Sequence, residues 1–409
     1  MSQTIPPPVF DPFAPGFTDD PYPQYAALRS GAPAGRHPLG FFLLTRYEDV
    51  SGLLRAAMSV EDRNITDRQL IELREQVYGE DAARPRGISM LDRDPPDHTR
   101  LRRLVSKAFT PRAVEALRPR IARLVDEMLD AAGRQGRVDL VDALAFPLPF
   151  AVIAEMLGTP PADHERIRQL SGTVVRSLEP VNDPDMAAAI TAADAELTQI
   201  AAEMIAWKRA NPAGDLLTAL INAEDDGDVL DDDELIAQTL LLYIAGHETT
   251  VNLIGGGALA LLRQPGQLAL LRDDPALAAN AVEELLRYDS PVQASRRITL
   301  EPVSLRDVAI PAGAFVMASL GSANRDESFW GQDAAELRLG RENARQHVSF
   351  GAGPHHCLGA SLARLEASIV LVRLTARFPG LALDGEAAWN GRINLRGPAR
   401  LPVSLTPAR

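Results

Sequence analysis

Hydrophobic residues recur at helical spacing through the middle of the chain. From about residue 97 to residue 288, leucine, alanine and valine return every three or four positions, which places them on one face of successive α-helices. Proline and glycine interrupt this pattern and predict where one helix ends and the next begins. The breaks fall at Pro111, near Gly136, at Pro160-Pro161, near Pro212 and at Pro265.

The longest apolar helix is predicted over about residues 231–263. The stretch EDDGDVLDDDE (224–234) leads into it with eight acidic residues, which the positive end of a helix dipole favours. Three consecutive glycines (255–257) lower the helix propensity by about 2–3 kcal/mol. We therefore expect another helix to cross close to these glycines.

Alternating patterns predict a smaller β region beside the helices. GFFLLTRYEDV (40–50) indicates a strand that runs into a helix, and RRITL (296–300) and AFVMASL (314–320) indicate further strands. A loop-rich segment follows at 321–356, then a helix over 358–378 and a β-like tail. The pattern as a whole predicts a mainly α fold with a minor β region.

Two stretches have a weaker pattern. Residues 60–90 lack a clean period and are expected to form a long loop with one short helix. The first 20 residues are rich in proline and are expected to run along the surface. No linker divides the chain and no internal repeat is evident, so residues 1–409 are expected to form a single domain.

The composition excludes several classes of protein. A net charge of −13 argues against nucleic acid as a general partner. One cysteine permits neither an internal disulfide nor a thiolate-rich zinc site. The N-terminus lacks the pattern of a signal peptide, and the most apolar stretch (140–158) is broken by prolines and acids. We expect a soluble, cytoplasmic protein without a membrane partner.

The single cysteine, Cys357, has three interpretations. A lone cysteine is usually a small buried hydrophobe. Paired with His355 or His356, it would be the nucleophile of a hydrolase. As a lone thiolate ligand it suits haem iron.

The residues around Cys357 favour the ligand interpretation. Gly351 and Gly353 permit a tight turn and the close approach of a flat ligand. The helix predicted after Cys357 would direct free N–H groups and the positive end of its dipole at the sulfur, which stabilises a thiolate. Leu358 and Gly359 are the expected backbone donors.

The segment FGAGPHHCLG (350–359) resembles the pattern Phe-Gly-x-Gly-x-His-x-Cys-x-Gly of the cytochrome P450 superfamily, with every fixed position filled. The resemblance implies one catalytic domain with the family's triangular-prism fold. It also implies that Cys357 is the axial thiolate of haem b, that Phe350 and Gly351 belong to the haem-binding loop, and that His355 reaches a haem propionate. His356 falls on a variable position and receives no role.

A second motif, IAGHETTVN (244–252), lies inside the long apolar helix. It begins like a zinc-protease HExxH, but the second histidine position is Val251. In a buried helix, Thr249 would simply donate a hydrogen bond to the carbonyl of Ala245.

The functional interpretation of this motif uses the same geometry. Ala245 and Gly246 are small and leave a dent one turn before Thr249. The motif resembles the family's Ala/Gly-Gly-x-Asp/Glu-Thr-Thr. The resemblance implies that dioxygen binds in the dent, and that Thr249 and Glu248 deliver protons to it.

Glu284 and Arg287 form an i,i+3 pair on a predicted helix, a spacing that alone usually marks a solvated surface pair. Here it resembles the family's Glu-x-x-Arg. The resemblance implies a structural triad closed by an arginine before the thiolate, for which Arg341 is the candidate. The family usually has Phe-Asp-x-x-Arg there, whereas this chain has Leu337-Arg338.

Three further residues are assigned to the haem propionates. His98 and Arg102 lie at i,i+4 on one helix face, which would otherwise indicate a surface pair. Within DPPDHTRLRRLVSKAF (94–109) they match the family's first haem-side helix. Arg297 aligns with another propionate ligand, with Arg296 as its competitor. Buried carboxylates require paired donors of this kind.

The source of electrons is expected to lie outside the chain. No GxGxxG motif for flavin or nicotinamide is present. The stretch RLRRLVSKAFTPR (100–112) has five basic residues and no acid, which indicates either a solvated helix face or a docking patch for an acidic donor. Resemblance to soluble bacterial members implies a ferredoxin and its NAD(P)H-dependent reductase.

The predicted function is that of a haem-thiolate monooxygenase. The chain would hydroxylate a lipophilic organic molecule with dioxygen and act as a monomer. The alternatives are a peroxide-driven peroxygenase, a non-catalytic haem-binding protein and a cysteine hydrolase. Apolar positions near the predicted site give the candidate substrate pocket: Met90, Leu91, Leu242, Val292, Ser295 and Ile393.

Overall fold

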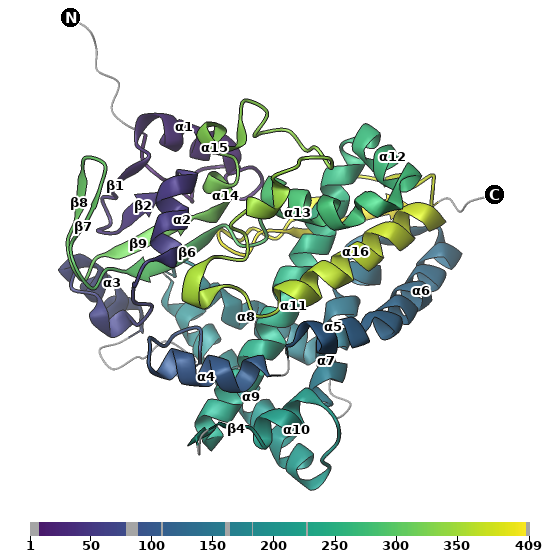
Figure 1. Cartoon of the computed structure of the whole chain (residues 1–409), viewed down its shortest axis with the longest axis horizontal. Coiled ribbons are helices and arrows are strands. Elements are labelled where there is room, and N and C mark those ends of the chain that lie inside the picture. Colours follow the sequence, from purple (N-terminus) through teal and green to yellow (C-terminus); the bar gives the residue numbers. More distant parts are fainter. Residues whose placement is uncertain are drawn as a thin grey trace, which may run out of the picture.

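The structure, a computed structural model, describes residues 8–78, 89–107, 109–159, 164–181, 183–225 and 228–405. Viewed down its shortest axis, the molecule has a roughly triangular outline, with the larger sheet at one side and helices over the rest (Figure 1). This arrangement confirms the predicted mainly α fold with a minor β region.

The helical elements follow the pattern of apolar positions. The α-helices are α1 (Tyr22–Gly31), α2 (Tyr47–Arg55), α3 (Arg68–Tyr78), α4 (Asp97–Ser106), α5 (Pro111–Ala116), α6 (Arg118–Gln135), α7 (Pro147–Leu157), α8 (His164–Val174), α9 (Pro184–Ala210), α10 (Leu216–Ile221), α11 (Asp232–Leu262), α12 (Pro265–Asp273), α13 (Ala278–Tyr288), α14 (Leu320–Ala323), α15 (Glu327–Trp330) and α16 (Ala360–Arg377). Short helical turns lie between them: η1 (Asp62–Asn64), η2 (Val141–Ala145), η3 (Val175–Leu178), η4 (Pro275–Leu277), η5 (Ala344–Gln346) and η6 (Gly353–His355).

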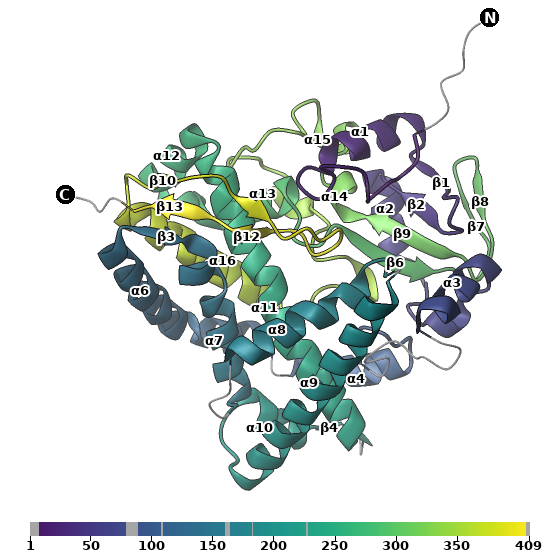
Figure 2. The same cartoon turned by 180° about the vertical axis from the view of Figure 1, so that it is seen from behind.

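Helix α11 runs through the middle of the molecule, with α16 on one face (Figure 1) and α8 and α9 across the opposite face (Figure 2). Its start is fixed by a capping box: the Asp231 side chain accepts from the backbone N–H of Glu234, and the Glu234 side chain accepts from that of Asp231. From Leu235 onward almost every side chain of α11 is buried, so the helix is held by packing on all sides.

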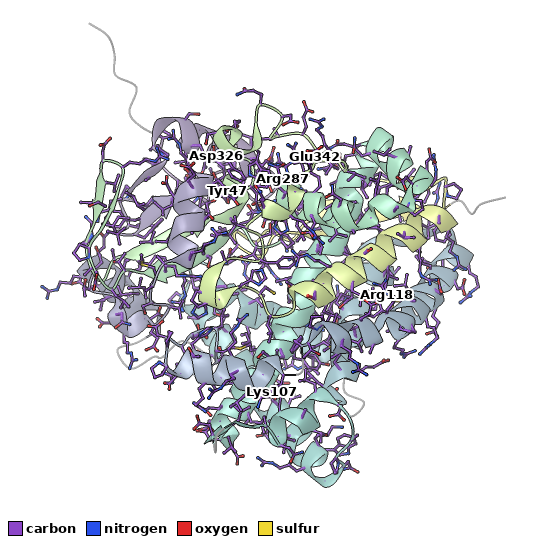
Figure 3. The ribbon with its side chains drawn as sticks, viewed as in Figure 1. Tyr47, Lys107, Arg118, Arg287, Asp326 and Glu342 are labelled. Carbon is purple, nitrogen blue, oxygen red and sulfur yellow. The ribbon has the colours of Figure 1, made fainter. Side chains whose placement is uncertain are left out.

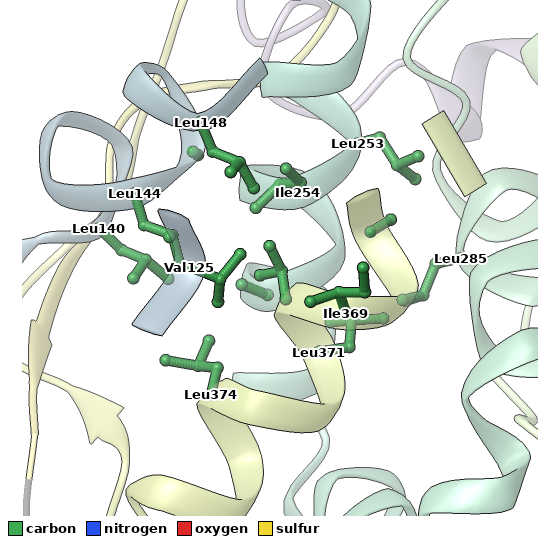
Figure 4. Close-up of a cluster of buried hydrophobic side chains, with 14 of the residues drawn as sticks. Val125, Leu140, Leu144, Leu148, Leu253, Ile254, Leu285, Ile369, Leu371 and Leu374 are labelled. Atoms are coloured by element: carbon green, nitrogen blue, oxygen red, sulfur yellow. The ribbon is translucent and has the colours of Figure 1, made fainter. Parts of the chain in front are cut away.

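The main core lies where α6, η2, α7, α11, α13 and α16 meet. Figure 4 shows Val125, Ile254 and Ile369 converging there from three of these helices. Burying each such side chain contributes about 1.5–3 kcal/mol. The core thus fixes α16, and with it the Cys357 loop, against α11.

The glycines of α11 allow two close approaches. A Cβ on Gly257 would lie 3.1 Å from Leu285 Cδ1 of α13, and one on Gly255 would lie 2.9 Å from Pro398 Cγ. The expected helix crossing is therefore present at Gly257, whereas Gly255 meets the strand β12 (Pro398–Arg400).

The largest sheet has the order β1-β2-β9-β6, with β2 and β9 parallel and the other pairs antiparallel. Its strands are β1 (Ala34–Arg36), β2 (Phe42–Leu44), β6 (Ala294–Ile298) and β9 (Phe315–Ser319). The smaller pairings use β3 (Arg137–Asp139), β4 (Glu224–Asp225), β5 (Asp228–Val229), β7 (Val303–Leu305), β8 (Val308–Ile310), β10 (Ala382–Leu383), β11 (Ala388–Trp389), β12 and β13 (Pro402–Ser404).

Several element boundaries differ from the sequence pattern. Within the stretch 60–90, residues 79–88 lie outside the described residues, and the rest contains η1 and the 11-residue α3, which is more helix than expected. Strand β3 interrupts the region read as helical, because it pairs with β13 at the far end of the chain. A pairing at that separation has no local signal in the sequence.

Candidate active site

The middle of α11 borders a space inside the molecule. Leu242 and Ile244 are buried, yet Ala245 is exposed and Gly246 and Thr249 are partly exposed. A helix that is buried on all sides exposes such residues only where its neighbours stand back. Ala245 and Thr249 thus border the dent that the sequence predicted, whereas a Cβ on Gly246 would lie 3.3 Å from Ile153 Cδ1 of α7.

The Cys357 loop is held by its backbone. Gly353 has a φ of +70°, and a Cβ there would lie 2.3 Å from the carbonyl oxygen of Leu54, so only glycine fits. Gly351 also has a positive φ, +68°. The backbone N–H of Cys357 donates to the carbonyl of Phe350 at 2.9 Å, which closes the loop around the thiol.

The Cys357 thiol is exposed although it lies deep in the structure, so it too faces an internal space. Burial raises its pKa, while the backbone N–H groups of Gly359 and Ala360 and the charge of Arg102 act in the opposite direction. The expected donors were Leu358 and Gly359. The structure instead has Gly359 and Ala360 as the donors, because α16 begins at Ala360.

Four nitrogen-bearing side chains gather beside this loop. The rings of His98 and His355 lie 4.1 Å apart, and Arg102 and Arg297 are close enough to influence them. Burial, aided by the neighbouring positive groups, lowers the pKa of His355 to about 3, and burial beside Arg296 lowers that of Arg297 to about 10. Within the described residues no carboxylate pairs with Arg102 or Arg297, and His98 Nε2 is buried without a hydrogen-bond partner.

The two neighbouring arginines of β6 have different surroundings. Arg296 pairs with Asp62 and, at 3.1 Å, with Asp92. Arg297 is buried, and among the described residues it donates to Ser295 Oγ at 2.9 Å and to the carbonyl of Arg296 at 2.6 Å and forms no ion pair. Since Arg297 lacks an anionic partner and Arg296 has two, Arg297 is the one available to an anionic ligand.

Glu248 and Thr249 are held differently along α11. Thr249 Oγ1 donates to the carbonyl of Ala245 at 2.9 Å, which leaves its oxygen lone pairs to accept a hydrogen bond. Glu248 Oε2 pairs with Arg392 at 2.7 Å, and its Oε1 lies 3.6 Å from His247 Nε2. Burial alone would raise the pKa of Glu248, but His247 and Arg392 lower it to about 2. At rest Glu248 is therefore a carboxylate.

Glu284, Arg287 and Arg341 are in mutual contact. Both Glu284 and Arg287 have fully buried side chains, joined at 2.7 and 2.8 Å, and Arg341 Nε lies 3.1 Å from Glu284 Oε1. Arg287 also donates to the carbonyls of Asn324, Ala334 and Glu336. The triad thus fastens the loop that precedes the cysteine.

At positions 337–338, where the sequence departs from the family pattern, the backbone takes part. The N–H of Arg338 donates to Glu284 Oε1 at 2.9 Å, and the Arg338 side chain turns outward to Asp333. Leu337 is buried in the main core.

The comparisons with known proteins agree with this geometry. A family model described as "Cytochrome P450" matches residues 271–389. The chain is 44% identical over 406 residues to cytochrome P450 107B1 of Saccharopolyspora erythraea, which covers 96% of each chain. It is 41% identical to the cytochrome P450 monooxygenase PikC of Streptomyces venezuelae, over 98% of this chain and 95% of that protein.

The chain belongs to the cytochrome P450 family. Among solved structures, the myxobacterial cytochrome P450 CYP267B1 in complex with myristic acid is 36% identical and has a TM-score of 0.88, covering 97% of this chain and 99% of that one. This P450 is an oxidoreductase, a haem-thiolate monooxygenase that uses dioxygen and electrons delivered from reduced nicotinamide by partner proteins.

The residues of this P450 fit its haem. His98 and Arg297 are buried, Arg102 and His355 are partly buried, and in the described residues no carboxylate pairs with either arginine. The carboxylates of a haem would supply the missing anionic partners. The Cys357 thiol, which faces the adjoining space, would be the thiolate ligand of the haem iron.

Replacing Arg297 with glutamine is expected to speed haem loss about tenfold or more, because a hydrogen bond to a charged partner is worth about 1.5–3 kcal/mol. Haem transfer to apomyoglobin measures the rate. Arg296→Gln is the matched control, since Arg296 has its own acidic partners and should leave the rate unchanged. Equal rates in the two variants would contradict the assignment of Arg297 to a propionate.

The six predicted pocket residues do not form one group. Met90 and Leu242 are buried in one cluster, against which Val292 packs. Ile393 packs against a different cluster, near Phe10, and Ser295 accepts a hydrogen bond from Arg297. Leu91 is exposed. Met90, Leu242 and Val292 are therefore the part of the prediction that the structure brings together.

The sequence reasoning missed a second buried network. Glu283, next to Glu284, pairs with Arg364 at 2.7 Å and with His347 at 3.0 Å, and Arg364 lies over the ring of Phe350 at 4.5 Å. These partners lie on α13, α16 and the loop between, so no local motif joins them. It also missed Arg392, the partner of Glu248.

None of the helices in the described residues combines the length and the apolar run needed to cross a membrane.

Proposed function

We propose that this P450 hydroxylates a lipophilic organic molecule, with haem b as its cofactor and with electrons that a ferredoxin carries from an NAD(P)H-dependent reductase. The observation that supports haem b is the cluster of His98, Arg102, Arg297 and His355, in which no described carboxylate forms an ion pair with either arginine and His98 Nε2 is buried without a partner. Haem b carries two propionates, and these would pair with that cluster.

Residues of the Cys357 loop would hold the haem. Cys357 would hold the iron through its sulfur, with the backbone N–H groups of Gly359 and Ala360 tempering the charge on that sulfur. Phe350 and Gly351 would shape the loop beneath the haem. When bound, the haem supplies the electron-transfer and dioxygen chemistry of the family.

Protons would reach the site from the α11 side. The dent at Ala245 and Gly246 would give dioxygen room. The Thr249 O–H donates to the carbonyl of Ala245, and the hydroxyl oxygen would accept a hydrogen bond there. Glu248 would take up a proton from solvent and pass it toward Thr249. Because Glu248 is ionised at rest, it has to be protonated anew in each cycle.

Replacing Thr249 with alanine is expected to leave haem and ligand binding intact but to raise the peroxide released per NADH consumed several-fold, because the acceptor beside the dent is lost. Thr250→Ala is the matched control. Thr250 donates in the same way to the carbonyl of Gly246, at 3.1 Å, but is buried. A peroxide yield that is the same in Thr249→Ala, Thr250→Ala and the unmodified protein would contradict the proposed role of Thr249.

The apolar residues Met90, Leu242 and Val292 support a lipophilic substrate. A terpenoid, a steroid, a fatty acid and a polyketide lactone form a suitable panel. Each is titrated into the oxidised protein, and a shift of the Soret band reports that the ligand has entered next to the iron. A panel in which only strongly charged, hydrophilic compounds shift the band would overturn this substrate class.

The electron donor is tested by comparing two supplies. NADH with a ferredoxin and its reductase is expected to support turnover, and hydrogen peroxide alone to support much less. A dependence on the basic stretch 100–112 would appear as a loss of rate with rising salt. Turnover by peroxide alone at the higher rate would favour the peroxygenase alternative. The monomeric state, the single domain and the cytoplasmic location stay predictions from the sequence.

A further inference from the structure

The partner of Glu248 comes from a distant and well-fixed part of the chain. Arg392 lies 144 residues beyond Glu248, in a turn between β11 and β12. Its Nη1 donates to Glu248 Oε2 at 2.7 Å and its Nη2 donates to the carbonyl of Gly172, in α8, at 3.3 Å. One guanidinium group thus joins α11, α8 and the C-terminal turn.

The turn that carries Arg392 is fixed on its inner side. Asn390 accepts from the backbone N–H of Arg392 at 3.1 Å and donates to the carbonyl of Leu395 at 2.8 Å. Asn394 accepts from the backbone N–H of Ala294, at the start of β6, at 2.9 Å. These bonds hold the turn against the sheet, so the position of Arg392 is set before it meets Glu248.

The same turn is tied to the segment that follows α8. Glu179, just after η3, accepts the backbone N–H groups of Ile393 at 2.9 Å and Asn394 at 3.3 Å. On the other side of Glu248, His247 Nε2 lies 3.3 Å from Ser171 Oγ, also in α8. Both neighbours of the Glu248 carboxylate therefore contact α8, at adjacent residues.

We propose that Arg392 is a positioning residue for Glu248. The position of the Glu248 carboxylate then depends on how α8 and η3 pack against the C-terminal turn. When α8 and η3 are seated, Arg392 and His247 hold the carboxylate in one place beside Thr249. When they move away, Arg392 loses its hydrogen bond to the Gly172 carbonyl, and the turn loses its hydrogen bonds to Glu179. Glu248 then loses its fixed position. The inference rests on the proposed proton role of Glu248.

The first test measures peroxide released per NADH consumed, with myristic acid as probe ligand and a plant-type ferredoxin and reductase as donors. Arg392→Gln is expected to raise this ratio several-fold, and Arg392→Lys to restore most of the original value because it keeps the charge. In a Glu248→Gln background, Arg392→Gln should add nothing. Arg400→Gln, at an exposed arginine of β12, is the matched control and should leave the ratio unchanged.

Two outcomes of that test are distinguishable. If Glu248→Gln alone leaves the peroxide ratio unchanged, the proposed role of Glu248 is wrong and this inference falls with it. If Glu248→Gln raises the ratio and Arg392→Gln adds its full effect on top, Arg392 does not act through Glu248 and only the inference is overturned.

The second test needs no turnover. Hydrogen–deuterium exchange of residues 164–178 is followed in the haem-loaded protein. Arg392→Gln and Glu179→Gln should each speed exchange in this segment several-fold, and Arg392→Lys should not. Unchanged exchange in both glutamine variants would show that the turn does not hold α8 and η3 in place, and would overturn the proposed coupling.

Discussion

Cys357→Ser is expected to abolish the strongly red-shifted Soret band that the reduced protein shows with carbon monoxide, and to reduce hydroxylation to background. Cys357 is the only thiol in 409 residues, so no other side chain can supply a thiolate. A serine hydroxyl in the same loop does not ionise near neutral pH and is a poor ligand for iron. The absorption spectrum before and after reduction measures the result.

His356→Gln is the matched control for this change. His356 lies next to the cysteine in the same loop. Its backbone carbonyl accepts from Arg102 Nη2 at 2.6 Å and its backbone N–H donates to the carbonyl of Gly353 at 3.1 Å, and neither bond depends on its side chain. The control should keep the red-shifted band. A red-shifted band that persists in Cys357→Ser would contradict the assignment of the ligand, and a protein that never takes up haem would favour the hydrolase alternative.

Glu284→Gln is expected to destabilise the fold by about 3–5 kcal/mol, because removing one partner of a buried ion pair leaves the other charge uncompensated. Here the change strands two guanidinium groups, Arg287 and Arg341. Urea denaturation of the haem-loaded protein, followed by circular dichroism, measures the midpoint. If the variant does not accumulate in folded form, Arg341→Gln, which leaves the fully buried Glu284–Arg287 pair intact, is the milder test.

The chain offers a matched control with the same spacing. Glu115 and Arg118 also form an i,i+3 pair, but both side chains are about half exposed. Arg287 is fully buried, and Figure 3 labels Arg287 and Arg118 on different parts of the molecule. Glu115→Gln should leave the midpoint unchanged within error, since exposed pairs contribute little. Equal midpoints for Glu284→Gln and Glu115→Gln would refute the role given to burial.

The sequence predicted those parts of the site whose residues are neighbours in the chain. The Cys357 loop, the Ala245–Thr249 stretch and the Glu284–Arg287 pair each fit within one turn or one helix, so their spacing alone carries the signal. The same locality explains why α11 was predicted to within a residue or so of its observed ends.

What the sequence left out depends on contacts between distant segments. Arg392 meets Glu248 only because the C-terminal turn folds back over α8, and Glu283 meets Arg364 only because α13 packs on α16. Arg137–Asp139 becomes a strand because β13 lies beside it. In each case no local sequence pattern marks the residues, and their role follows from a partner that is distant in the sequence.

Leu337 and Arg338 stand where the family pattern has Phe-Asp. Glu284 recognises position 338 through the amide hydrogen that every amino acid except proline possesses. The side chain at position 338 can therefore change during evolution while the hydrogen bond from its backbone to Glu284 is kept. A sequence pattern that requires aspartate at this position would therefore miss enzymes that keep the contacts of Glu284 in full.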